Sequence, residues 1–212
     1  MEKLNQETYE LLLKANEDAC EFITIQSGIK NWYELTYEIF KDAPLISIND
    51  FYKLIAYAYS WMPTIPDVKA HLIKNPEDLL LNLRTLKKGD LSILPSLLKE
   101  LIPVINNSLT GTSKVLHFIL PDRIPIIDSN VVRGWDIFFF KLYPHFEVPK
   151  FPHYKSALNS NHTARYIQYM ELFNEWVANS NGSITLRDLE FGFYELGKNT
   201  IKEEKYLPIY LY

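Results

Sequence analysis

Signals for helix starts recur along this chain, and apolar residues at three- and four-residue spacing follow them. The clearest is Asn75-Pro76-Glu77-Asp78, which places a capping side chain, a first-turn proline and first-turn acids ahead of a run of leucines. The 212 residues include only seven glycines, none of them in the spacing that cradles phosphates in nucleotide-binding folds. The chain shows no internal repeat and no flexible linker. These features predict an all-α fold that forms one compact unit over residues 1–212.

Pattern and punctuation also predict where the helices lie. They place helices over 4–15 and 31–40, from the Asn49-Asp50 cap to Pro63, from Asn75 onward, over 91–102, from Thr112 or Ser113 to Pro121, from Asp128 through Phe138, over 164–177 and over 186–196. Thr185 and Asp188 form a capping box for the last of these, which Gly197 is expected to end. The tail 206–212 is apolar, and two roles fit it: folding back onto the core, or self-association.

The charge of the chain is weakly acidic overall and uneven along its length. The net charge of −4, from 22 basic and 26 acidic residues, gives no global field that would attract nucleic acid. The stretch 84–141 holds eight basic and five acidic residues and so carries +3. This mildly basic middle leaves contact with phosphates open, although solvated surface charge is the more usual role of such residues.

The sequence excludes several classes of protein and cofactor. Apolar runs such as 137–140 are far shorter than the roughly 18–20 residues of a membrane-spanning helix. The first seven residues are polar and acidic, unlike a secretory signal. We therefore expect a cytoplasmic protein with no membrane partner. Because Cys20 is the only cysteine, we expect no internal disulfide, no four-cysteine metal site and no iron–sulfur cluster.

Three side chains in the middle of the chain could carry chemistry. Lys114 lies in the first turn of an otherwise apolar predicted helix, where partial desolvation favours the neutral, nucleophilic amine. Asp128 lies at a helix N-terminus, where backbone N–H groups and the helix dipole favour a carboxylate that can stabilise a nearby cation. His117, on the same face as Lys114, either assists a proton transfer or satisfies a buried hydrogen bond. Each residue also has an ordinary structural explanation.

The order of these features resembles the core of the helix-hairpin-helix DNA glycosylases. The resemblance covers about residues 91–140: a helix, a glycine-containing turn at 109–112, Lys114 at the head of an apolar helix, and a Pro-x-x-Asp-Ser-Asn-Val-x-Arg cap built on Asp128. It implies two packed helical subdomains around a degenerate helix-hairpin-helix, with the target nucleotide flipped into a pocket between them. By position, Lys114 resembles the nucleophile that attacks C1′ of the deoxyribose. Asp128 resembles the carboxylate that supports the oxocarbenium ion and the imine.

The resemblance also implies a DNA-binding surface and a substrate. In the family, the hairpin backbone binds a DNA phosphate, often with a monovalent cation as the one structural cofactor. By position, the DNA-binding residues would be Thr110, Gly111, Thr112, Ser113 and Arg133. Because the iron–sulfur cysteines are missing, the nearest branch is that of the compact 8-oxoguanine glycosylases. The implied function is base excision and abasic-site lyase activity on an oxidised purine, such as 8-oxoguanine, in damaged double-stranded DNA.

A non-catalytic role is the alternative hypothesis. The hairpin has one glycine and is one residue shorter than the family pattern, and the net charge of the chain is −4. Both features favour a catalytically inactive helical scaffold that retains the glycosylase fold and binds nucleic acid or a protein partner.

Overall fold

The computed structural model describes residues 3–20, 35, 37, 39, 44–62, 64–149 and 160–206, and it confirms the all-α prediction. The α-helices are α1 (Gln6–Cys20), α3 (Ile48–Tyr59), α4 (Pro76–Lys87), α5 (Leu94–Val104), α6 (Leu109–Ile119), α7 (Ser129–Asp136), α8 (Ser160–Asn179) and α9 (Leu186–Tyr206). Two 3-10 turns, η1 (Ala70–Leu72) and η2 (Leu91–Ile93), and the π-helical turn η3 (Ile137–Leu142) accompany them.

Within the described residues, no strand is present beyond one isolated antiparallel bridge between Val68 and Ile105. None of the described helices is long and apolar enough to cross a membrane. Most of the helix predicted at 31–40, and the tail from residue 207 onward, lie outside the described part of the chain.

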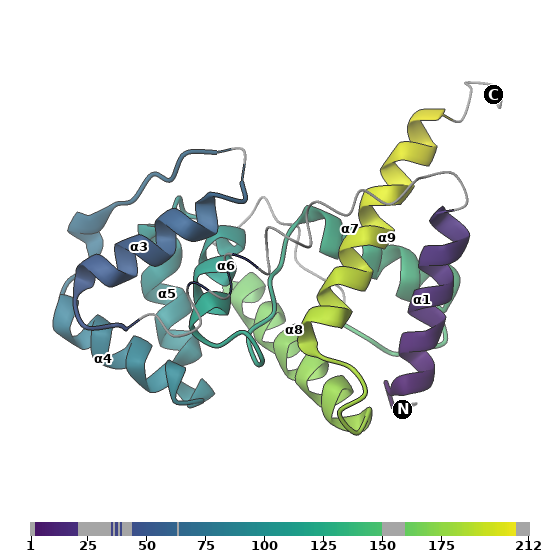
Figure 1. The fold of residues 1–212 in the computed structure, drawn as a ribbon, viewed down its shortest axis with the longest axis horizontal. Helices are drawn as coiled ribbons and strands as arrows, with labels where there is room; N and C mark the ends of the chain where they lie inside the picture. Colours follow the sequence, from purple (N-terminus) through teal and green to yellow (C-terminus); the bar gives the residue numbers. More distant parts are fainter. Residues whose placement is uncertain are drawn as a thin grey trace.

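Figure 1 shows the helices in two groups. One group contains α3, α4, α5 and α6, with α6 packed on both α3 and α5. The other contains α1, α7 and α9, with α9 packed on both α7 and α1. Helix α8 contacts α5 in the first group and α9 in the second. Because the connection from α6 to α7 passes from one group to the other, the end of α6 and the start of α7 lie at the junction.

The two groups differ in how their cores are filled, although both belong to one continuous hydrophobic core. In the first group the helices contribute leucines at helical spacing, all of them fully buried: Leu79, Leu83, Leu86, Leu97 and Leu101. Where the second group packs with η3 and α8, stacked and edge-on aromatic rings fill the space instead: Trp135, Phe139, Phe173, Trp176 and Phe193.

The local signals for helix starts are largely confirmed. The side chain of Asn75 accepts hydrogen bonds from backbone N–H groups in the first turn of α4. Thr185 and Asp188 exchange hydrogen bonds of 2.8 and 3.1 Å at the start of α9, as a capping box should. At α3 the cap lies earlier than predicted, because Ser47 is the N-cap and its N–H donates to Asp50 at 2.9 Å.

Helix α6 begins at Leu109, earlier than predicted, so the expected glycine-containing turn is wrong. The Ser108 hydroxyl caps the helix by accepting a hydrogen bond from the N–H of Gly111 at 3.0 Å. The chain reverses one step before, at Asn106 and Asn107, whose φ angles of 53° and 52° are left-handed. Asparagine tolerates this conformation better than most residues, so the turn needs no glycine.

Helix α9 continues through Gly197 to Tyr206, so the predicted end at this glycine is also wrong. Gly197 lies against α7, where a Cβ atom on it would stand 2.0 Å from the carbonyl oxygen of Asn130. A Cβ on Gly134 of α7 would stand 1.9 Å from the carbonyl oxygen of Phe193. These glycines therefore serve a close crossing of two helices and not a helix end.

We predict that Gly197→Ala lowers the free energy of unfolding by more than about 3 kcal/mol, because the added methyl group meets backbone that cannot move aside alone. Urea unfolding followed by circular dichroism measures the loss. Gly89→Ala is the control: Gly89 has φ of 95° and open space around it. It should lose only the backbone cost of about 1–2 kcal/mol. Equal losses in the two variants would contradict the close crossing.

Candidate functional site

Lys114 projects from α6, and its side chain is only 9% exposed. Among the residues that the structure describes, none forms a hydrogen bond or a salt bridge with its amine. Burial lowers the pKa of the Lys114 amine from its usual value. The Arg187 guanidinium adds to this lowering of the pKa, whereas the carboxylates of Asp128 and Glu190 oppose it. The site therefore contains a buried amine that loses its proton more readily than an ordinary lysine does.

Asp128 is the N-cap of α7, as predicted, and is half-buried. Its Oδ1 atom accepts hydrogen bonds from the N–H groups of Asn130 at 2.9 Å and Val131 at 3.0 Å. Its Oδ2 atom accepts none from the described residues, so it is available to a cation. The Asp128 carboxylate acts to raise the pKa of the Lys114 amine. The two predicted catalytic residues therefore lie within electrostatic range of each other.

The backbone that leads from α6 to Asp128 is held by side chains of three helices. Buried carbonyl and N–H groups need partners, and here side chains of α6, α8 and α9 supply them. Three carbonyl groups accept hydrogen bonds from side chains: Ile124 O from His117 Nδ1 (2.7 Å), Pro125 O from Tyr166 Oη (2.8 Å) and Ile126 O from Tyr169 Oη (3.3 Å). Two N–H groups donate to side chains: that of Ile126 to Glu190 Oε1, and that of Ile127 to Ser113 Oγ (3.2 Å). The position of Asp128 therefore depends on both groups of helices.

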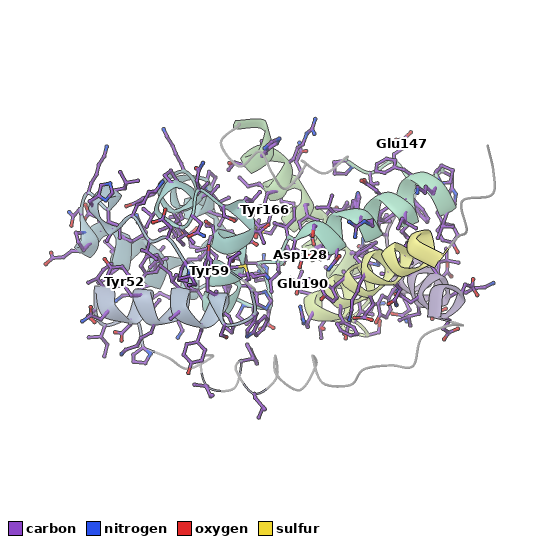
Figure 2. All side chains as sticks on the ribbon, turned by 90° about the horizontal axis from the view of Figure 1, so that it is seen from above. Tyr52, Tyr59, Asp128, Glu147, Tyr166 and Glu190 are labelled. Carbon is purple, nitrogen blue, oxygen red and sulfur yellow. The ribbon has the colours of Figure 1, made fainter. Side chains whose placement is uncertain are left out.

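Glu190 of α9 supplies the carboxylate of this anchoring cluster, with a side chain only 1% exposed. One oxygen accepts the Ile126 N–H, and the other forms an ion pair with Arg187 at 3.0 Å. Figure 2 shows Glu190, Asp128 and Tyr166 in the region where the two groups of helices meet. A charged group this deep requires compensation, which the backbone N–H and the guanidinium provide.

Glu190 and Arg187 were not predicted from the sequence, although one signal pointed to the carboxylate. Glu190 lies on the same face of α9 as Leu186 and Phe193, which are four residues before it and three after it, and both are buried. An acidic residue within an apolar stripe rarely reaches the core without a partner.

His117 is fully buried and satisfies a hydrogen bond, which is the structural one of its two predicted roles. Burial lowers the pKa of His117 even though the Glu190 carboxylate, 3.7 Å from Nδ1, acts to raise it. Because a carbonyl only accepts, the proton lies on Nδ1 and is donated to Ile124 O. The imidazole is thus neutral at neutral pH and contributes to the anchoring of the backbone.

Two of the predicted DNA-binding side chains face the interior. Thr112 and Ser113 are fully buried. The hydroxyl of Thr112 donates to Ser108 O at 2.8 Å, and that of Ser113 donates to Thr110 O at 2.9 Å. Both side chains are enclosed and already bonded in this conformation, and binding of DNA by Thr112 and Ser113 stays a prediction.

The other predicted DNA-binding residues are also engaged in the fold. Thr110 is half-buried, and Gly111 packs so closely on Tyr59 that a Cβ atom would stand 2.5 Å from its hydroxyl. Arg133 is half-buried and joins α7 to α9 through a hydrogen bond of 3.1 Å to Gly197 O. The monovalent cation was expected at a turn formed by 109–112, a stretch that the structure places within α6.

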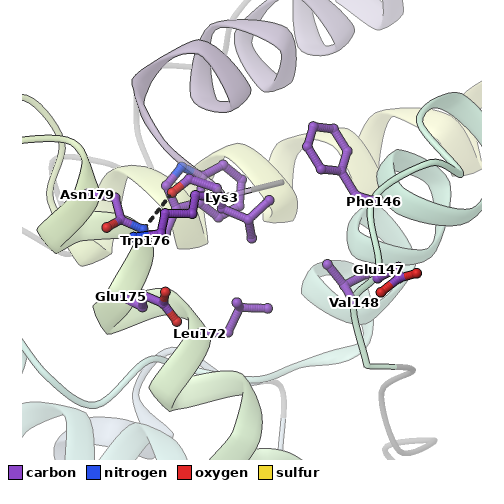
Figure 3. Close-up of a pocket in the computed structure, with 9 residues that line it drawn as sticks. Lys3, Phe146, Glu147, Val148, Leu172, Glu175, Trp176 and Asn179 are labelled. Atoms are coloured by element: carbon purple, nitrogen blue, oxygen red, sulfur yellow. Dashed lines mark hydrogen bonds between the residues drawn. The ribbon is translucent and has the colours of Figure 1, made fainter. Parts of the chain in front are cut away.

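A pocket of 340 Å³ lies away from these residues, between α8 and the stretch that follows η3 (Figure 3). None of the predicted site residues lines it; its walls are Lys3, Leu4, Phe146, Glu147, Val148, Leu172, Glu175, Trp176 and Asn179. Among the described residues, no group of three or more His, Cys, Asp or Glu side chains is placed to hold a metal ion.

The sequence matches no known family model, and neither curated proteins nor solved structures give a match. A functional assignment therefore rests on the geometry around Lys114 and Asp128.

We predict that His117→Gln weakens the loss of stability in mild acid. Because the pKa of His117 is lower in the folded chain than the unfolded value of 6.5, the unfolded state binds more protons below that pH. The wild-type protein should therefore lose stability as the pH falls from about 7 to about 5, and the variant should lose less. Urea midpoints across this range measure the difference, with the exposed His71→Gln as control. Identical pH dependence in wild type and His117→Gln would contradict a neutral, buried imidazole.

Proposed function

We propose that this protein is a DNA base-excision glycosylase with abasic-site lyase activity, acting in the cytoplasm on an oxidised purine such as 8-oxoguanine in duplex DNA. The observation that carries the proposal is the buried Lys114 amine, without a hydrogen bond or salt bridge to the described residues and within electrostatic range of the Asp128 carboxylate. A lysine nucleophile must be neutral to attack, and burial favours that form.

The chemistry assigns a separate role to each residue. The lone pair of Lys114 Nζ forms a bond to C1′ of the deoxyribose, the bond from C1′ to the base breaks, and the base leaves with that electron pair and takes up a proton. The Asp128 carboxylate stabilises the positive charge that develops on the sugar in the transition state. Loss of a proton from nitrogen and opening of the C1′–O4′ bond then give the imine. Removal of a C2′ proton from this imine expels the 3′ phosphate.

The placement of Asp128 supports this role. Only its Oδ1 atom is used in capping α7, so Oδ2 can face a cationic sugar. The cap also gives a useful variant, because asparagine caps helices about as well as aspartate. Asp128→Asn therefore removes the charge while preserving the start of α7.

The catalytically inactive scaffold is the second candidate, and the internal use of Thr112, Ser113 and Arg133 favours it. A scaffold that binds nucleic acid should bind damaged and undamaged duplexes equally. Its affinity should fall with salt with a log–log slope near about −0.9 for each phosphate contacted. A strong preference for the lesion-containing duplex would count against this candidate.

We predict that borohydride reduction cross-links the wild-type protein to duplex DNA that carries 8-oxoguanine or an abasic site. Lys114→Ala should abolish the cross-link, because the imine cannot form. Asp128→Asn should lower its rate about a hundredfold by removing transition-state stabilisation. Denaturing gels measure the covalent adduct, and Lys99→Ala, which alters an exposed lysine on α5, is the control.

The results identify the nucleophile and distinguish the glycosylase from the scaffold. A cross-link that survives in Lys114→Ala shows that another amine is the nucleophile. Absence of any adduct with wild-type protein on every duplex removes the glycosylase proposal in favour of the scaffold.

A further inference from the structure

Arg187 and Glu190 form a partly buried ion pair that the proposed reaction does not use. The pair lies at 3.0 Å, one turn apart on α9, and Glu190 is almost fully enclosed whereas the Arg187 side chain remains 32% exposed. Enclosing a charged pair carries a desolvation cost, and a well-packed apolar pair would often be at least as stable. Stability alone therefore gives a weak reason for these residues at the centre of the molecule.

We propose that Glu190 and Arg187 are positioning residues for the Lys114–Asp128 pair: Glu190 holds the backbone that carries Asp128, and the ion pair sets the charge beside the Lys114 amine. This inference rests on the proposed function for its biological meaning. Its physical content, the control of the amine by the ion pair, can be measured without DNA.

Hydrogen bonds support the role of Glu190 in positioning Asp128. Lys114 and Asp128 are 14 positions apart, and the chain between them leaves α6, turns and enters α7. Neutral side chains anchor most of this stretch, and Glu190 is the charged residue among the anchors, through its bond from the Ile126 N–H. A charge-assisted bond is stronger than a neutral one, so it holds the backbone just before Asp128 most firmly.

The charges that surround the Lys114 amine support the role of the ion pair in setting its electrostatic environment. Helix α7 contributes the Asp128 carboxylate, and α9 contributes Glu190 and Arg187. Neighbouring groups from α6 and α8 face Glu190: the neutral His117 imidazole and the hydroxyl groups of Tyr166 and Tyr169. Glu190 and Arg187 act on the Lys114 pKa in opposite directions, so loss of either one unbalances the site with a known sign.

The sign of each change follows from charge. Glu190→Gln removes an anion and leaves Arg187, so the Lys114 ammonium is less stabilised and its pKa falls. Arg187→Gln removes a cation and leaves Glu190, so the pKa of Lys114 rises. Glutamine retains an amide oxygen that can accept the Ile126 N–H, which keeps the Glu190→Gln variant close to the wild-type packing.

The test is a pH titration of the Lys114 side chain by nuclear magnetic resonance in protein labelled with ¹³C-lysine, with the Cε signal identified by its absence in Lys114→Arg. We expect the midpoint to fall by about half a pH unit or more in Glu190→Gln and to rise by a similar amount in Arg187→Gln. Glu195→Gln is the matched control, because Glu195 lies on the same helix and pairs with Lys198 at 3.4 Å. Its midpoint should equal that of the wild type.

Two midpoints that move in the same direction, or not at all, would overturn the inference. Should Glu190→Gln not fold, the rise expected in Arg187→Gln still decides, because a merely structural role would not raise the midpoint.

Borohydride trapping of the same variants on abasic-site DNA separates this inference from the proposed function. The pH at which the trapping rate reaches half its maximum should follow the midpoints measured by resonance. Opposite shifts in the titration without any trapped adduct would retain the ion-pair inference and remove the lyase. Trapping by wild-type protein without opposite shifts would retain the lyase and remove the role of the ion pair.

Discussion

The close crossing of α7 and α9 is the constraint on which the rest of the site depends. Gly134 and Gly197 let the two backbones meet without side chains between them. The N-terminus of α7, and with it Asp128, is thereby brought near Glu190 of α9, while α6 brings Lys114 from the other group of helices. Each group supplies one half of the candidate site, so its geometry depends on how the two halves pack.

Burial affects the charged groups of the site differently. Glu190 has compensation for its desolvation, from a backbone N–H and from Arg187. The amine of Lys114 has no such bond from the described residues, so burial acts on it with less opposition. A buried lysine amine without a hydrogen-bond partner contributes little to the stability of the fold. We therefore interpret Lys114 as a nucleophile.

Features encoded by neighbouring residues were predictable from the sequence, and features created by packing were not. The caps at Asn75 and Asp128 depend on a few adjacent residues and are confirmed. Gly197 carries the signal of a helix end, but its missing side chain serves the crossing with α7. Lys114 could be named because a lysine is unusual in an otherwise apolar helix, and Asp128 because it carries the capping signal of the next helix. Glu190 escaped because its partners, the Ile126 N–H and the junction around it, exist only in the folded chain.

We propose that Lys114 supplies the reacting amine of a Schiff-base enzyme. To test this directly, the wild-type complex with an abasic-site duplex is reduced, the adduct is digested with protease and nuclease, and the modified residue is located by mass spectrometry. We expect one modified peptide, with the reduced sugar adduct on Lys114. An adduct on the N-terminal amine or on an exposed lysine such as Lys99, with Lys114 unmodified, would contradict it.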